Sequence, residues 1–163
     1  MTHKIDKANL TSESGIALVE VIITLGIMLV LFAGIRPLIS SNVSAQVNES
    51  AMQIISAFRI ARESSSARVN NSAHGVFLSI NPSGVDSMTL YQGSSYALRD
   101  VTYDVVTTFD AGINVITTLP GTEANFARQL AVPSTTGTIT ITHAAGGISK
   151  VITLSSTGKI ESN

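Results

Sequence analysis

Apolar residues form one nearly uninterrupted stretch close to the start of the chain. Residues 16–35 read IALVEVIITLGIMLVLFAGI, and Glu20 is the only strongly polar residue among them. As an α-helix this stretch would be about 30 Å long, which matches the hydrocarbon core of a bilayer. The pattern therefore predicts a membrane-spanning or filament-core helix over residues 16–36.

The helical pattern continues over residues 37–71, but there it is amphipathic. Apolar residues recur close to every 3.6 residues, which is typical of a helix that buries one face. Gly34 and Pro37 lie near the junction, and since both residue types weaken a helix interior, a kink is expected there. The apolar positions are Leu38, Ile39, Val43, Val47, Ala51, Ile54, Ile55, Phe58, Ala61 and Ala67.

Beyond residue 71 the apolar pattern changes to a period of two, which is typical of β-strands. Turn signals rich in Gly, Pro, Asn and Asp separate the strand candidates. The last two candidates are expected to form a hairpin from Thr138 to Leu154. The expected strands are Val76–Ile80, Ser87–Gln92, Thr102–Thr108, Asn114–Thr118, Ala127–Val132, Thr138–His143 and Ser149–Leu154.

These patterns predict an α+β fold. A long N-terminal helix, membrane-spanning in its first half and amphipathic in its second, would pack on a C-terminal antiparallel β-sheet head. The expected segments are a polar leader over 1–15, the apolar helix over 16–36, the amphipathic helix over 37–71 and the head over 72–163. The chain length of 163 residues suits one such head.

Composition narrows the classes of partner. Hydrophobic residues make up 44% of the chain and charged residues only 13%, which suggests that part of it lies in lipid. The head, residues 72–163, carries four scattered basic and six acidic side chains. Binding to a phosphate backbone requires clustered Lys and Arg, so nucleic acid is not an expected partner.

Candidate catalytic and metal-binding residues do not form recognisable motifs. His3, His74 and His143 each lack a second ligand at i+3 or i+4. The chain has no cysteine, so thiolate metal sites are excluded as well. The serine runs have no nucleophile-elbow context, and no phosphate loop is present. We therefore expect no catalytic residues, no metal and no cofactor, and a protein that is not an enzyme.

Glu20 is the anomaly within the apolar stretch. A carboxylate at the centre of a membrane helix costs about 2.5–3.5 kcal/mol on insertion scales, and such residues usually face a partner. One interpretation is a tolerated acid near the end of the helix, whose side chain reaches the interface. The other is a charge that pairs with a cation from a neighbouring molecule.

The residues GIALVE, from Gly15 to Glu20, resemble the type III signal of type IV prepilins, in which Glu follows five positions after Gly. In that family, prepilin peptidase cuts after the Gly and methylates the new terminal amine. The resemblance implies cleavage between Gly15 and Ile16 and methylation of Ile16, where the family usually has Phe. Pro37 falls where many such pilins carry a helix-kinking proline.

The resemblance also gives Glu20 a role in assembly between subunits. The ammonium that cleavage creates on Ile16 would be neutralised by Glu20 of a neighbouring subunit, which turns two costly buried charges into one pair. The implied partners are prepilin peptidase, other pilin or pseudopilin subunits and an inner-membrane assembly platform. The implied location is the inner membrane, spanned once with the head outside the cytoplasm, and later a periplasmic or cell-surface filament.

The end of the chain carries a second resemblance. The segment GTITITHAAGGISKVITLSSTGKIE is similar to the closing hairpin of the GspH/FimT subfamily of minor pseudopilins and minor pilins, and ISAFRIARESSSARVN running into GVFLSI is similar to its helix and first strand. A structural filament subunit is therefore the leading hypothesis. The alternatives are a tip module that binds DNA or a secreted substrate, and an unprocessed single-span membrane protein that keeps residues 1–15.

Overall fold

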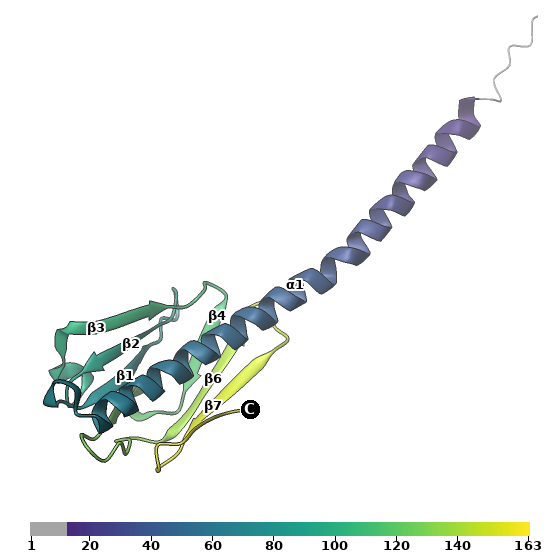
Figure 1. Cartoon of the computed structure of the whole chain (residues 1–163). Helices are drawn as coiled ribbons and strands as arrows, with labels where there is room; N and C mark the ends of the chain where they lie inside the picture. Colours follow the sequence, from purple (N-terminus) through teal and green to yellow (C-terminus); the bar gives the residue numbers. More distant parts are fainter. Residues whose placement is uncertain (1–12) are drawn as a thin grey trace, which may run out of the picture. The chain divides into compact units, whose positions relative to one another are not determined.

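The computed structural model describes the backbone of residues 13–163. Helix α1 runs from Glu13 to Ser66, and within it the side chains of residues 18–32 and 42–66 are described (Figure 1). The chain divides into two compact units, Met1–Ser41 and Asn42–Asn163. The two described stretches of α1 therefore belong to different units.

The second unit contains all the strands that the structure describes. They form two antiparallel four-stranded sheets, with the orders β3-β2-β1-β5 and β4-β6-β7-β8 (Figure 1). The strands are β1 (His74–Ser79), β2 (Ser87–Gln92), β3 (Asp100–Thr108), β4 (Ile113–Thr117), β5 (Glu123–Phe126), β6 (Gly137–His143), β7 (Ser149–Leu154) and β8 (Ile160–Ser162), and the short 3-10 helices are η1 (Val69–Asn71), η2 (Tyr96–Leu98) and η3 (Pro120–Thr122).

One face of the second stretch of α1 forms the centre of the core. Val47, Ile54 and Ala61 are fully buried, and Phe58 is only 1% exposed. Their spacing of seven, four and three residues places them on a single side of the helix. Both sheets contribute to the same hydrophobic cluster, through Val76, Leu78, Met88, Ala124 and Phe126 from the first sheet and Ile113, Val115, Ile139, Ile141, Ile152 and Leu154 from the second.

Asp86 joins the two sheets through its carboxylate. The residue precedes β2 and is only 5% exposed. Its Oδ1 accepts a hydrogen bond from the backbone N–H of Asn81, and its Oδ2 accepts one from Val115 of β4, both at 2.8 Å. Because β4 is an edge strand, this bond satisfies an N–H group that no further strand pairs with. A charged acceptor makes stronger bonds to buried N–H groups than a neutral one.

The end of α1 is tied to the first strand by a buried serine. Ser65 is fully buried, and its Oγ accepts a hydrogen bond from His74 N at 2.8 Å and donates one to His74 O at 3.4 Å. Arg68 then adopts a left-handed conformation with φ of 56°, which ends the helical path. The position at which α1 stops is thus fixed relative to β1.

Most of the strand predictions are confirmed. Ser87–Gln92 and Ser149–Leu154 coincide with β2 and β7. The predicted hairpin is formed by β6 and β7, whose register pairs Ile139 with Ile152 and Ile141 with Lys150. The alternation of Ile and Thr in β6 identified this hairpin because only the Ile side chains face the core.

The predicted strand at Ala127–Val132 is wrong. The strand in this region is β5, which ends at Phe126, and the chain then turns so that Ala127 N donates to Val132 O at 3.0 Å. Gln129 and Ala131 have positive φ angles of 76° and 50°, which a strand does not contain. The three-residue strand β8 was not predicted, since it is too short to display a period.

The predicted architecture of one long helix packed on one sheet is also wrong. The described side chains of α1 fall in two stretches that belong to separate compact units. Among the described helical residues, those in the core all come from 42–66, and the strands form two four-stranded sheets. The period-2 pattern identifies strands, but it does not specify which strands become neighbours.

The membrane-spanning helix predicted over 16–36 requires correction as well. Within the ranges that the structure describes, no helix combines the length and the apolar character needed to cross a membrane. The prediction of a single-pass inner-membrane location is overturned with it.

Replacing Asp86 with Ala should destabilise the second unit, because the N–H groups of Asn81 and Val115 lose their acceptor. An unsatisfied buried donor costs about 1–3 kcal/mol. Because the Asn81 N–H is only partly buried, it costs less than the buried Val115 N–H, and the expected loss in the free energy of unfolding is about 2–4 kcal/mol. Denaturant unfolding followed by circular dichroism measures this loss as a lower midpoint. The matched control is Asp110→Ala, at an exposed acid, which should change stability by less than about 0.5 kcal/mol. Equal midpoints for the two variants would contradict the bridging role.

Candidate functional site

The first described stretch of α1, residues 18–32, is apolar on every side, and we name it the apolar stretch. A helix on the surface of a globular protein confines its apolar residues to one face. An apolar surface that surrounds a helix marks a site that binds another apolar surface. Its large apolar side chains, which are between 54% and 71% exposed, are Leu18, Val19, Val21, Ile22, Ile23, Leu25, Ile27, Met28, Leu29, Val30, Leu31 and Phe32.

Glu20 is the single charged residue of the apolar stretch. Its side chain is exposed, and in the described ranges it forms no ion pair. One turn later, Thr24 Oγ1 donates to the carbonyl oxygens of Glu20 and Val21, both at 2.9 Å, so the threonine hydroxyl is satisfied within the helix. The Glu20 carboxylate therefore remains accessible to an approaching cation.

Gly26 interrupts the apolar stretch with a notch. An added Cβ at this position would meet no atom within 4 Å, so the glycine is not required by contacts within the described chain. The hollow beside it has a volume of about 330 Å³ and is lined by Ile23, Ile27, Val30 and Leu31. A glycine on a helix surface lets another backbone or side chain approach closely. The notch therefore suits contact with a second apolar element.

The other residues that the sequence assigns to processing and bending lie outside the described side chains. Gly15 and Ile16, the predicted cleavage and methylation position, fall in this category, and so do Gly34 and Pro37, the predicted kink. Cleavage, methylation and kinking consequently remain predictions. Of the predicted site residues, only Glu20 can be placed on a described surface.

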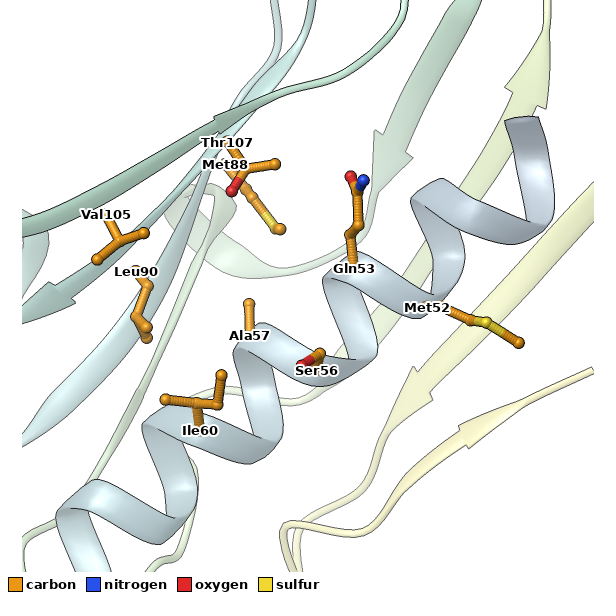
Figure 2. A pocket seen from close by; sticks show the side chains of 9 residues that line it. All are labelled: Met52, Gln53, Ser56, Ala57, Ile60, Met88, Leu90, Val105 and Thr107. Atoms are coloured by element: carbon orange, nitrogen blue, oxygen red, sulfur yellow. The ribbon is translucent and has the colours of Figure 1, made fainter. Parts of the chain in front are cut away.

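A second apolar surface is the groove between α1 and the first sheet, in the second unit. It has a volume of about 400 Å³. Figure 2 shows Met88, Leu90 and Val105 directed from the strands toward α1, with Ala57 and Ile60 on the facing side of the helix. We name it the α1–β3 groove, and its lining residues are Met52, Gln53, Ser56, Ala57, Ile60, Met88, Leu90, Val105 and Thr107.

The groove has a rigid floor and an open rim. Met88 and Ala57 on the floor are 4% and 6% exposed and belong to the hydrophobic core. On the rim, Met52 is 71% exposed and Val105 is 57% exposed. Val105 lies on β3, which is an edge strand of its sheet. The groove therefore presents apolar side chains to the surroundings without any movement of the core.

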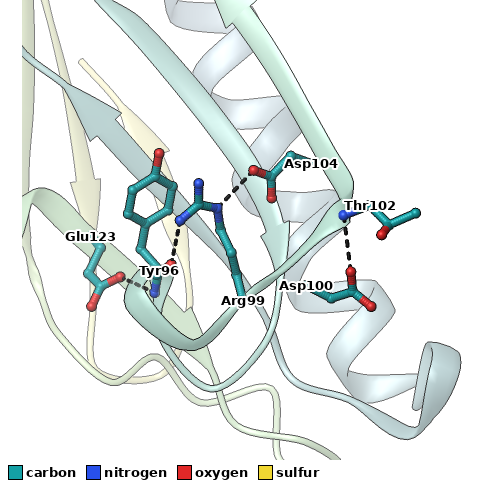
Figure 3. Close-up of polar contacts among 6 residues, drawn as sticks. All are labelled: Tyr96, Arg99, Asp100, Thr102, Asp104 and Glu123. Atoms are coloured by element: carbon teal, nitrogen blue, oxygen red, sulfur yellow. Dashed lines mark hydrogen bonds and ion pairs between the residues drawn. The ribbon is translucent and has the colours of Figure 1, made fainter.

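A polar cluster lies on the other face of the first sheet, around Tyr96, because its strand residues Phe77 and Asp104 alternate with residues that face α1. The Tyr96 ring stacks on Phe77 with centroids 3.8 Å apart, and the Arg99 guanidinium lies 3.7 Å from the Tyr96 ring centroid. Arg99 is held by Asp104, with Nε and Oδ2 separated by 2.8 Å, and Arg99 Nη1 donates to Tyr96 O at 2.7 Å (Figure 3). Each partner fixes the arginine in one position over the ring.

The cluster continues inward through Glu123. Its Oε2 accepts hydrogen bonds from the Tyr96 N–H at 2.8 Å and from the Tyr91 hydroxyl at 3.1 Å (Figure 3 shows the first). Burial raises the pKa of Tyr91 well above its usual value of about 10, so this hydroxyl stays protonated and donates. Gly75 makes room for it, because a Cβ there would overlap the Tyr91 side chain and lie 2.9 Å from Ala124 O. These contacts lock η2 onto the sheet, which is a structural role.

The described residues do not form a cluster of metal ligands. No group of three or more His, Asp or Glu side chains in the described part is placed to hold a metal ion. Comparisons with protein families, with curated proteins and with solved structures find no match for this chain. The functional assignment therefore rests on the apolar stretch and on the α1–β3 groove.

The sequence pattern did not predict the groove. Met52, Ser56 and Ile60 were not among the apolar positions expected to pack on the head, although they recur at intervals of four residues. The two apolar members, Met52 and Ile60, lie on one side of the helix and are the sequence signal of a second, narrower apolar face. The other wall of the groove could not be predicted without the fold, because Val105 is brought close to α1 by the pairing of β3 with β2.

His74 should make the stability of the second unit depend on pH. Burial lowers its pKa below the usual 6.5, although hydrogen bonds with the Ser72 backbone and the Gln92 side chain oppose the shift. The unfolded chain therefore binds a proton at this histidine more readily than the folded chain does. The contribution of neutral His74 to the free energy of unfolding is fully present above about pH 6.5, and it is lost as the pH drops toward the folded pKa. Urea midpoints between pH 7.5 and 5 should fall more for the wild type than for His74→Gln. The His143→Gln variant should behave like the wild type, and equal slopes for all three chains would refute this account.

Proposed function

We propose that this chain is a structural subunit, a minor pilin or pseudopilin, of a type IV pilus or type II secretion-like filament, and that it is not an enzyme. The observation that carries the proposal is the apolar stretch, which exposes large side chains around the whole helix. Such a surface is stable only when another apolar surface covers it. In a filament, the equivalent helices of neighbouring subunits provide that cover.

The proposed mechanism begins with processing at the start of α1. A prepilin-type peptidase cuts between Gly15 and Ile16 and methylates the new amine, which leaves an ammonium at the beginning of the apolar helix. The resemblance of GIALVE to the type III prepilin signal supports this step. Glu20 of the neighbouring subunit then neutralises the ammonium, and its exposed position on the helix supports that role.

Charge pairing sets the register of assembly in this mechanism. Burial of apolar side chains is not directional, so it brings helices together without fixing their relative height. A single acid in an otherwise apolar stretch pairs with a single terminal cation, and any other register leaves both charges buried without a partner. The proposed partners are the peptidase, other filament subunits and an assembly platform.

The Glu20→Gln variant should be processed normally but should enter filaments poorly. The substitution keeps the size of the side chain and removes the charge, so the Ile16 ammonium of a docking neighbour would be buried unpaired. Breaking a buried pair costs about 3–5 kcal/mol, which corresponds to at least about a hundredfold weaker docking. The measurement compares processed subunit in whole cells with subunit recovered in sheared filaments.

The matched control is Glu49→Gln, an acid on the same helix in the second unit. Glu49 is exposed, and among the described residues it accepts a single 3.4 Å hydrogen bond from Gln53 Nε2, so its neutralisation should leave recovery in filaments unchanged. Equal recovery for Glu20→Gln and wild type would show that Glu20 is not the docking partner. Recovery lost equally with both variants would indicate a general effect of charge instead.

A further inference from the structure

The α1–β3 groove is lined by uncharged residues. None of its lining residues carries a formal charge, and its polar groups are confined to Gln53, Ser56 and Thr107. A charged segment would lose its hydration there without gaining an ion pair. The groove therefore fits an uncharged apolar element, and residues 21–32 of the apolar stretch contain no charged side chain.

The groove also fits such an element by length. Along α1 it extends from Met52 to Ile60, which is about 12 Å of helix. On the apolar stretch, Ile22, Leu25 and Leu29 are spaced by three and four residues and form one ridge, which is about 10 Å long. Their side chains are 60%, 60% and 71% exposed. At the middle of the groove, the small residues Ser56 and Ala57 leave space between the larger ones.

We propose that the α1–β3 groove of one copy of this chain receives the Ile22–Leu25–Leu29 ridge of a second copy. The proposal rests on the proposed function, since it names the surface of the second unit that meets the apolar stretch in an assembly. Every copy carries one ridge and one groove. The contact is thus heterologous, and repeating it generates an open filament unless the rotation happens to close a ring.

A second copy explains the groove better than pairing at the β3 edge does. Pairing of two β3 strands would use the backbone groups of the free edge and extend the first sheet. It would not fill the groove, whose walls are side chains on the face of the sheet that meets α1. A ridge of apolar side chains from a second copy would fill it.

Disulfide cross-linking tests the contact directly, because the chain has no cysteine of its own. Two full-length variants, Ser56→Cys in the groove and Leu25→Cys on the ridge, are produced with different tags, co-assembled and oxidised. The product to be measured is the mixed dimer that carries both tags. The control pair replaces Ser56→Cys with Thr153→Cys, at an exposed position of β7 on the second sheet.

The expected result is a mixed Ser56→Cys and Leu25→Cys dimer at least tenfold more abundant than the control dimer. Filaments that form while the two yields are equal would overturn the groove contact and leave the filament proposal standing. Mixed dimers from a chain that forms no filaments would support the groove contact and overturn the filament proposal. Predominant Ser56→Cys homodimers would indicate that two grooves contact each other. Unhindered maleimide labelling of Ser56→Cys in filaments would indicate an empty groove. Either result would overturn the groove contact.

Discussion

Burial of one face of α1 against both sheets is the interaction on which the second unit depends. Each sheet has one apolar face, and the cluster that contains Val47, Ile54 and Phe58 includes residues from both. Without the helix, the two faces would lose their shared central layer. The buried bonds of Ser65 to β1 and of Asp86 to β4 add directional contacts to this non-directional burial. They fix where the helix ends and how the sheets are joined.

The same constraint determines which apolar surfaces remain free. The Val47–Ala61 face of α1 is occupied by the core, so Met52 and Ile60, on another side of the helix, remain exposed at 71% and 46%. The apolar stretch is exposed to a similar degree. One unit therefore offers an apolar groove and the other an apolar helix. A filament of identical copies would cover both kinds of surface, and this is the physical basis of the proposed function.

Local periodicity predicted the elements, whereas the arrangement depended on distant contacts. The alternation of Ile139 and Ile141 with threonines identified a hairpin, because the period of a half-buried strand is visible in its own sequence. The division into two sheets was not visible, since it is fixed by groups such as Asp86 and Val115. Glu20 was recognisable in the sequence as an isolated charge. The groove was not recognisable, since Met52 and Val105 come together only in the folded chain.

The apolar stretch should become covered when copies of the chain assemble into a filament. Maleimide labelling of Leu29→Cys, at a side chain that is 71% exposed, measures this directly in a chain without native cysteine. Free subunit and sheared filaments are compared, with Thr153→Cys as the reference site. Labelling of Leu29→Cys should be at least tenfold slower in filaments than in free subunit, whereas labelling of Thr153→Cys should be unchanged. Equal labelling of Leu29→Cys in both states would contradict assembly through this stretch.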